Sequence, residues 1–205
     1  FRSHLDSYDV ATGGIDCGTG IGPMMEAARM IALSGAKPKR TILFVAFAGE
    51  EFGLLGAKAY VKTHAKELGK IANLFNRDGG PTPPVGISVP QAMYDDFVEV
   101  CKPVKEIRAD YPFEVKVAKP FKRPTQSGGT DASVFAVEGV PTFGFNTQDI
   151  KGYNFSYGEI WHTERDLYTK NIPEYQEHAA TVTAVVALGI ANLSKQLSRE
   201  GMHKK

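Results

Sequence analysis

The feature that most limits the fold is an uninterrupted apolar run, TILFVAFA, from Thr41 to Ala48. Its β-branched and aromatic residues favour a strand. Because polar residues do not alternate with apolar ones, the pattern is typical of a strand covered on both faces, as in a parallel sheet. Gly49, Glu50 and Glu51 follow directly. We therefore expect two neighbouring carboxylates at the carboxyl end of a central strand.

The rest of the chain alternates helical and strand patterns. Strands are expected at 41–48, 71–75, 113–118 and 141–145, with a proline-rich loop at 81–84. Helices are expected at 21–32 (apolar face Ile21, Met24, Met25, Ala28, Ile31 and Ala32), 54–68, 91–102, after Thr130, and from Pro173 (apolar face Val182, Val185, Val186, Ile190, Leu193 and Leu197). This order predicts an α/β fold, a three-layer sandwich with a mostly parallel central sheet flanked by helices. Ligands in such folds bind at the carboxyl ends of the strands.

Composition excludes several classes of partner. A length of 205 residues with 42% hydrophobic and 23% charged residues is typical of one globular domain. The formal charge of +1 gives no indication of nucleic-acid binding. No apolar run approaches the roughly 18–20 residues of a membrane span. Two cysteines, Cys17 and Cys101, are too few for a disulfide framework.

The glycine-rich stretch GGIDCGTGIGP, at 13–23, has two interpretations. A dinucleotide-binding loop needs a strand before the glycines, a third glycine three residues after the second, and an acidic residue about 20 positions later. Here Pro23 replaces the third glycine, the preceding segment is loop-like, and the later region, 37–40, is basic. The pattern instead favours a tight turn that presents Asp16 as a metal ligand.

Further candidate ligands flank this turn. In an extended segment, His4 and Asp6 project to the same side, so Asp6 is expected to accept a hydrogen bond from one ring nitrogen while the other binds metal. Adjacent residues such as Glu50 and Glu51 point in different directions. One glutamate is therefore expected to bind metal and the other to act as a general base, and adjacency does not decide which.

Asp78, before two glycines at a strand exit, and His162, in a loop before a helix, complete the pattern. Each residue alone is more typical of a turn or a solvated surface than of a metal site. Together, two histidines and three carboxylates, one of them bridging, suit a pair of divalent cations. The other histidines lie in helical or tail contexts and are expected to be solvated: His64, His178 and His203.

Five blocks of the sequence resemble, in order, those of the co-catalytic zinc exopeptidases, the family of bacterial zinc aminopeptidases and glutamate carboxypeptidases. They are HLDSYDVATGGIDCGTG, PKRTILFVAFAGEEFGLLGA, NRDGG, SGGTDASVFAVEGVPTFGF and WHTERDLY. The HLDS-D-V opening and the segment GGPTPPVG are most similar to the plasma glutamate carboxypeptidase-type branch. The resemblance covers nearly the whole chain.

The resemblance implies two Zn²⁺ ions per chain, with His4 and Asp78 on one, Glu51 and His162 on the other, and Asp16 bridging both. It also implies that Glu50 is the general base and that Asp6 orients His4. The function implied is hydrolysis of dipeptides or short peptides through a water activated by the two zinc ions. A secreted or periplasmic location and a homodimer are further expectations. Asp131 and Asp166 are expected to brace loops around the site.

Two departures from the family pattern stand out. Cys17 follows the bridging aspartate where an acidic residue or proline is common, and we expect it to pack or to alter the local charge. Strands normally precede the H-x-D motif, whereas here only three residues do, so 1–205 is expected to be a catalytic domain shortened at its amino end. The alternatives are a single-zinc acyltransferase similar to glutaminyl cyclases and a non-catalytic relative that acts as a binding domain.

Overall fold

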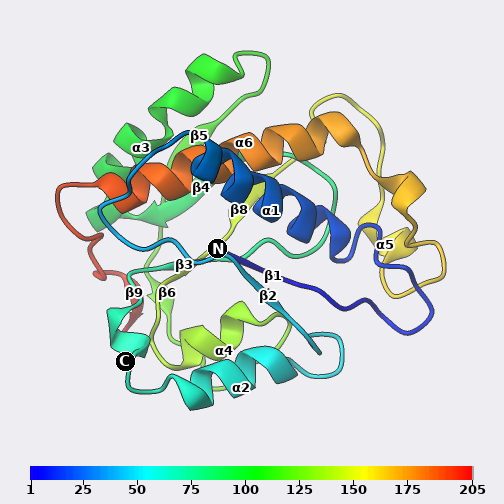
Figure 1. Ribbon diagram of the computed structural model, residues 1–205, viewed down its shortest axis with the longest axis horizontal. Coiled ribbons are helices and arrows are strands. Elements are labelled where there is room, and N and C mark those ends of the chain that lie inside the picture. The colour runs from blue at the N-terminus through cyan, green and yellow to red at the C-terminus, as the bar shows by residue number, and fades with distance from the viewer. Residues whose placement is uncertain (205) are drawn as a thin grey trace.

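Short strands cross the middle of the molecule, and helices cover them on two sides (Figure 1). The computed structural model describes residues 1–204. In Figure 1, helices α1 (Gly18–Leu33), α3 (Tyr94–Ile107) and α6 (Pro173–Asn192) lie on one side of the strands. Helices α2 (Leu55–Thr63) and α4 (Ala132–Val137) lie on the other side. This arrangement confirms the α/β class expected from the alternation of strand and helix patterns.

The strands next to the site run in parallel. Two pairs form: β1 (Arg2–His4) with β2 (Val45–Phe47), and β3 (Leu74–Phe75) with β7 (Thr142–Phe143). An isolated parallel bridge between Arg2 and Asn76 joins β1 to the residue that follows β3. The carboxyl ends of β1, β2 and β3 therefore meet at one edge, which is where parallel sheets bind ligands.

The remaining strands form separate small sheets. Strand β4 (Pro84–Pro90) pairs in parallel with β5 (Glu114–Ala118) and antiparallel with β8 (Phe145–Thr147), and β6 (Phe121–Lys122) pairs in parallel with β9 (Met202–Lys204). The mostly parallel pairing is thus confirmed, although it is divided among sheets of two or three strands. The short elements are α5 (Tyr157–Ile160) and three single 3₁₀ turns (Leu68–Lys70, Gln91–Met93 and Tyr168–Lys170).

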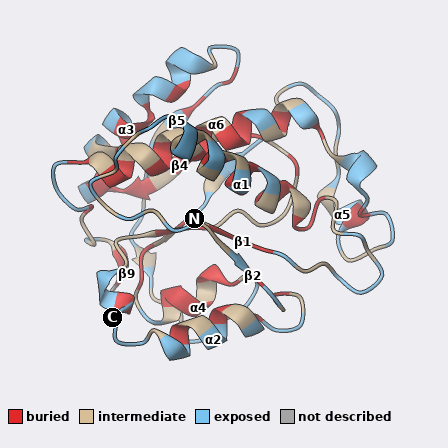
Figure 2. Ribbon diagram, in the orientation of Figure 1, coloured by how far each residue is buried: buried red, intermediate tan, exposed pale blue. Residues whose placement is uncertain are grey.

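Two apolar clusters hold the layers together. In the larger one, Val182 and Val186 of α6 are fully buried against Phe97 of α3 and the strands beneath. In the smaller one, Phe47 of β2 packs with Phe135 of α4 and with the start of α2. Figure 2 shows the middle of α6 buried, while α2 turns much of its surface to solvent. Both clusters support the strands that end at the site.

The expected strand at 41–48 is only partly correct. Pairing is restricted to Val45–Phe47, and Leu43 is 57% exposed. Within the described residues β2 pairs with β1 alone, so its other edge has no strand beside it. Of the residues at 41–48 only Phe47 is buried, so the run is not covered on both faces. Its apolar composition indicated burial that the described residues do not provide.

Other elements differ in extent from the sequence predictions. The seven-residue strand β4 was missed, because prolines begin and end it at Pro84 and Pro90 and prolines are typical of loops. The first helix is confirmed, but Met25 on its predicted inner face is 64% exposed, while Met24 and Ala27 are buried. Its buried stripe is therefore narrower than the expected one. None of the helices among residues 1–204 is long and apolar enough to cross a membrane.

The expectation that three histidines are solvated is wrong for two of them. His178 is completely buried in α6, and its Nε2 lies 2.9 Å from the carbonyl oxygen of Pro84. His203 is 8% exposed, and its Nε2 lies 2.8 Å from the hydroxyl of Thr142. His64 is half-buried and stacks on Tyr60. Histidine packs against aromatic rings as readily as it faces water, so a helical or tail context does not predict its exposure.

Candidate metal centre

The turn before α1 brings Asp16 to the carboxyl ends of β1 and β3. Gly13 has φ of 67°, and its carbonyl oxygen accepts the N–H of Gly18 at 2.9 Å, which closes the turn. At Gly20 an added Cβ would lie 2.1 Å from the hydroxyl of Ser3, so only glycine lets α1 approach β1 this closely. These glycines serve the turn and the packing of the helix, as expected.

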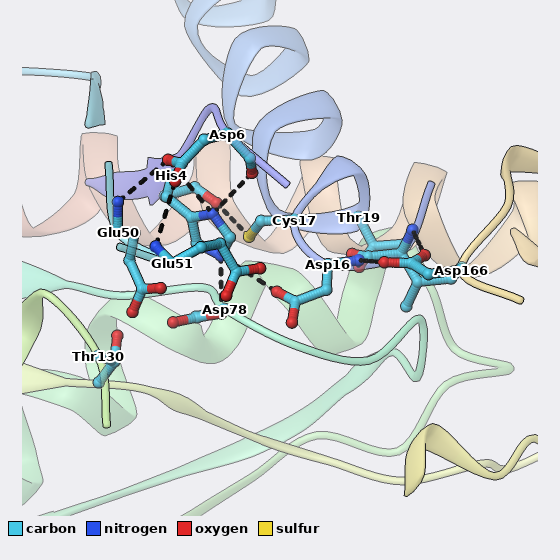
Figure 3. Close-up of polar contacts among 12 residues, drawn as sticks. His4, Asp6, Asp16, Cys17, Thr19, Glu50, Glu51, Asp78, Thr130 and Asp166 are labelled. Carbon is cyan, nitrogen blue, oxygen red and sulfur yellow. Dashed lines mark hydrogen bonds and ion pairs between the residues drawn. The ribbon is translucent and has the colours of Figure 1, made fainter. Parts of the chain in front are cut away.

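His4, Asp16 and Asp78 converge on one point (Figure 3). The Nε2 atom of His4 lies 3.1 Å from Asp16 Oδ1 and 3.2 Å from Asp78 Oδ1. His4 ends β1 and is 1% exposed. Because the bridge between β1 and the residue after β3 sets these segments side by side, residues 74 positions apart in the sequence meet here.

Glu51 and His162 form a second group around the same aspartate. The Nε2 atom of His162 lies 2.9 Å from Glu51 Oε2. One potential ligand atom from each of Asp16, Glu51 and His162 lies within 4.8 Å of the others, and the same holds for His4, Asp16, Cys17 and Asp78. Asp16 therefore belongs to both groups, the position expected of a bridging ligand.

The donor atoms fit zinc. Imidazole nitrogens and carboxylate oxygens are common zinc ligands, and Glu51 Oε1 is buried without a hydrogen-bond partner among the described residues. Burial lowers the pKa of His4, but its contacts with Asp16 and Asp78 outweigh burial and leave the pKa raised. A positive charge is thus stabilised where the carboxylates converge, and a bound cation would supply it.

Asp6 positions the site in a different way from the one predicted. His4 Nδ1 lies 3.0 Å from the main-chain carbonyl oxygen of Asp6 and 3.8 Å from its carboxylate. The carboxylate instead accepts the backbone N–H groups of Glu50 and Glu51, each at 3.1 Å (Figure 3). These two donors at the exit of β2 occupy both carboxylate oxygens. The predicted hydrogen bond from His4 to the Asp6 carboxylate is therefore replaced by one to the Asp6 carbonyl.

The two adjacent glutamates differ in their surroundings. Burial and the negative charge of Asp78 raise the pKa of Glu50 to about 7. Its carboxylate makes no side-chain hydrogen bond with the described residues, whereas that of Glu51 contacts His162. A carboxylate with a pKa near neutrality is suited to accept and return a proton. The surroundings of Glu50 thus fit a general base, and those of Glu51 fit a ligand.

Asp166 and Asp131 brace the loops around the site, as expected. The Asp166 carboxylate accepts the N–H groups of Ile15 at 2.6 Å and Asp16 at 3.1 Å, which fixes the turn that presents Asp16. Asp131 forms a fully buried ion pair with Arg2 of β1 at 2.6 Å. Arg2 also donates to the hydroxyl of Thr130. The loop at 127–131 is thereby tied to the strand that carries His4.

Sequence reasoning missed two residues of the site. The hydroxyl of Tyr157 donates to Asp16 Oδ2 at 2.8 Å, from the short helix α5. Lys58 of α2 lines the cavity that these residues and the ligand groups surround. Neither a tyrosine in a loop-rich region nor a lysine on an exposed helix gives a signal in the sequence.

Cys17 is 2% exposed, with its Sγ atom 2.7 Å from the hydroxyl of Ser3, so it packs as expected.

These residues surround one cavity of about 660 Å³. The acidic residues and His162 line it, together with Asn76 and Tyr157. The loop at 127–130 also lines the cavity, as does the single tryptophan, Trp161, which is 51% exposed. A cavity of this volume is typical of small-ligand sites and accommodates a short peptide.

Comparison with known proteins gives a consistent result. The sequence model described as "Peptidase family M28" matches residues 1–186. Carboxypeptidase Q of Mus musculus is 30% identical over 196 residues, which are 96% of this chain and 39% of that protein. This chain therefore spans about two fifths of the length of the curated relatives that it matches.

Two solved structures are informative. A peptidase M28 precursor from Shewanella amazonensis SB2B is 32% identical with a TM-score of 0.75, over 96% of this chain and 42% of that one. An Acidobacteriales bacterium glutaminyl cyclase is 17% identical with a TM-score of 0.63, over 93% of this chain and 68% of that one. At that identity, the second likeness shows a shared fold alone.

Proposed function

Because this chain belongs to peptidase family M28, we propose that it is a metal-dependent exopeptidase that hydrolyses dipeptides or short peptides with two zinc ions. The observation that carries the proposal is the position of Asp16, whose carboxylate lies in both groups of potential ligand atoms. His4 and Asp78 would hold one ion, Glu51 and His162 the other, and Asp16 both. A single-zinc acyltransferase needs only one such group.

The roles of the chain's own groups follow from their positions. Zinc bound here would supply positive charge that lowers the pKa of a water and polarises the substrate carbonyl. Glu50 accepts the proton of that water as its oxygen attacks the peptide carbon, and then passes the proton to the departing amine. Its pKa of about 7 suits both transfers. Asp6 keeps Glu50 turned to the cavity by fixing the backbone of both glutamates.

Tyr157 and Asp166 hold the bridging carboxylate in place. The Tyr157 hydroxyl donates to one oxygen of Asp16, and Asp166 accepts the backbone N–H of the same residue. The side chain and the main chain of Asp16 are thus fixed independently. This restricts its rotation and keeps its carboxylate within both groups of potential ligand atoms. Pre-organisation of this kind is expected of a residue that binds two ions.

Metal analysis combined with a dipeptide-library assay tests the proposal. We expect two zinc ions per chain and hydrolysis that is lost with a chelator and regained with zinc. One zinc ion, together with cyclisation of an amino-terminal glutamine, would favour the glutaminyl cyclase-like alternative. Tight zinc binding without turnover of any peptide would favour a non-catalytic binding domain.

The expected secreted or periplasmic location, the homodimer, and the assignment of 1–205 to one catalytic domain stay predictions. Cell fractionation would test the first. Sedimentation at several protein concentrations would test the second. Limited proteolysis, which cleaves between independently folded units, would test the third.

A further inference from the structure

The two histidines of the metal centre are held in different ways. Both ring nitrogens of His4 have polar partners, because Nδ1 lies 3.0 Å from the carbonyl oxygen of Asp6 and Nε2 faces the carboxylates. The Nε2 atom of His162 lies 2.9 Å from Glu51 Oε2, but its Nδ1 atom has no hydrogen-bond partner among residues 1–204. A ligating histidine is usually oriented by a hydrogen bond from its second ring nitrogen. A different contact has to orient His162.

The ring of Tyr8 lies flat against the ring of His162. The two centroids are 4.1 Å apart, and the two planes differ by 3°. Trp161 also contacts the imidazole, with 4.1 Å between centroids and 30° between planes. Trp161 directly precedes His162 and moves with it, whereas Tyr8 belongs to a distant segment of the chain. Of these two contacts, the one with Tyr8 therefore fixes the imidazole relative to the rest of the site.

The segment that carries Tyr8 is itself anchored. Tyr8 lies two residues after Asp6, whose carboxylate accepts two backbone N–H groups at the exit of β2. The carbonyl oxygen of Tyr8 accepts the N–H of Ala11 at 2.9 Å, which closes a turn. The hydroxyl of Thr12 then donates to the carbonyl oxygen of Asp166 at 3.0 Å. The loop is thus tied both to β2 and to the segment that follows His162.

The open surroundings of His162 make such a support necessary. Its side chain is 30% exposed. Its backbone has φ of 59°, which is uncommon for a residue other than glycine and persists where neighbours hold it. A ring that is free to rotate loses side-chain entropy when it binds an ion. A bound ion also draws electron density from the imidazole, and the face of an aromatic ring attracts the resulting partial positive charge.

We propose that Tyr8 is a positioning residue that orients His162 for the second zinc ion, the one held by Glu51 and His162. The inference rests on the proposed function and adds to its site a residue outside the ligand set. Because Tyr8 follows His4 in the same segment, the segment that supplies a ligand to the first ion also supports a ligand of the second. Loss of the Tyr8 ring should therefore weaken the second ion selectively.

Zinc titration of the metal-free protein tests the proposal. A chromogenic chelator competes for both ions, and the fluorescence of the single tryptophan, Trp161, reports the ion at His162 because the two rings are in contact. Tyr8→Leu removes the aromatic face but keeps an apolar side chain. We expect it to raise the dissociation constant of the second zinc ion about tenfold and to leave the first within about twofold. Tyr8→Phe and Tyr8→Trp, which keep a flat ring, should retain the affinity of the parent.

Tyr168→Leu is the matched control, because Tyr168 is largely exposed and its ring lies against no other aromatic ring among the described residues. It should leave both zinc affinities unchanged. Denaturant unfolding of the metal-free proteins separates positioning from general stability, and the Tyr8→Leu midpoint should lie close to that of Tyr168→Leu. In hydrolysis, Tyr8→Leu should lower kcat at limiting zinc, regain it in excess zinc, and leave KM unchanged.

Equal affinity of the parent and Tyr8→Leu for the second zinc ion would overturn this inference and leave the two-zinc exopeptidase intact. Equal weakening of both ions would also overturn it, because Tyr8 would then support the fold in general. If Tyr8→Phe weakened the second ion as much as Tyr8→Leu, the hydroxyl and not the stacked ring would be responsible. A parent protein that bound one zinc ion would overturn the two-zinc function together with this inference. Selective weakening of the second ion in a protein that hydrolyses no peptide would support the role of Tyr8 and overturn the function alone.

Discussion

The carboxylate of Asp6 accepts the backbone N–H of Glu50 at 3.1 Å, across the ends of the paired strands β1 and β2. Its second oxygen accepts the N–H of Glu51 at the same distance. A single side chain therefore fixes the turn from which two adjacent carboxylates diverge, one towards His162 and one towards the open cavity. The orientation of the proposed base and the proposed ligand therefore depends on two hydrogen bonds from the backbone to Asp6.

Replacing Asp6 by asparagine tests this relationship. The amide keeps one acceptor oxygen but presents an N–H₂ group to the other backbone donor, so one N–H loses its partner. We expect the free energy of unfolding to fall by about 1–2 kcal/mol and kcat to fall with it, while zinc content is retained. Chemical denaturation and initial rates measure the two effects. Asp9→Asn is the control, since Asp9 is exposed in the following loop. Unchanged stability and rate in Asp6→Asn would show that the hydrogen bonds are dispensable.

The same substitution, glutamate to glutamine, should have different effects on activity and zinc content at Glu50 and at Glu51. Glu50→Gln keeps shape and polarity but removes the proton acceptor, so we expect kcat to fall by about 10²–10⁴-fold with both zinc ions bound. Glu51→Gln removes a ligand, so it should weaken one zinc site, and excess zinc should partly restore activity. Metal analysis and initial rates on the same preparations decide the outcome. If Glu50→Gln lost zinc while Glu51→Gln kept it, the two roles would be reversed.

Asp16→Asn should have the largest effect on metal content. A shared carboxylate screens the repulsion between two dications, and the amide that replaces it lacks the negative charge. We expect less than one tightly bound zinc per chain after dialysis. Asp9→Asn again serves as the control. A variant that still held two zinc ions would limit Asp16 to a role in the turn.

Much of the site could be predicted from the sequence because its parts are local. Asp16 lies on a glycine turn, the two glutamates follow an apolar run, and Asp78 precedes two glycines. In parallel α/β folds such strand exits converge at one edge of the sheet. The order of the motifs therefore predicted which side chains would gather, and the structure brings all of them together.

What could not be predicted depends on contacts between distant segments. The Asp6 carboxylate accepts hydrogen bonds from the backbone of the two glutamates and not from His4. This choice depends on the pairing of β1 with β2, which no short sequence pattern contains. The ion pair between Arg2 and Asp131 joins residues 129 positions apart. Strand β4 was missed because its prolines indicate a loop locally, while its pairing with β5 and β8 is a tertiary effect.

His178 is a further case, and its burial leads to a prediction about acid stability. The ring is fully buried and stacks on Tyr111 with 4.1 Å between ring centroids. Its Nε2 donates to the carbonyl oxygen of Pro84, and Nδ1 has no partner among the described residues. A second proton on Nδ1 would thus create an unpaired buried charge. Burial accordingly lowers the pKa of His178 to about 4.

The sign of the effect follows from proton binding. Between pH 6.5 and about 4, the unfolded chain protonates this histidine while the folded chain does not. Acid therefore favours the unfolded state, and the contribution of His178 to stability falls as the pH falls through this window. A shift of this size corresponds to a loss of about 3 kcal/mol across it, with no effect above pH 7.

His178→Gln should remove this part of the pH dependence. Glutamine can still donate to the Pro84 carbonyl, but it does not titrate. We expect the variant to be less stable than the parent at pH 7, because the stacking on Tyr111 is lost, and the difference to shrink as the pH approaches 4. Denaturant unfolding of both proteins at pH 7, 6, 5 and 4 measures it. Carboxylates that titrate in the same range cancel in the comparison. If the parent and His178→Gln curves ran parallel from pH 7 to 4, the folded protein would bind this proton as readily as the unfolded chain, and the buried ring would not be the source of acid sensitivity.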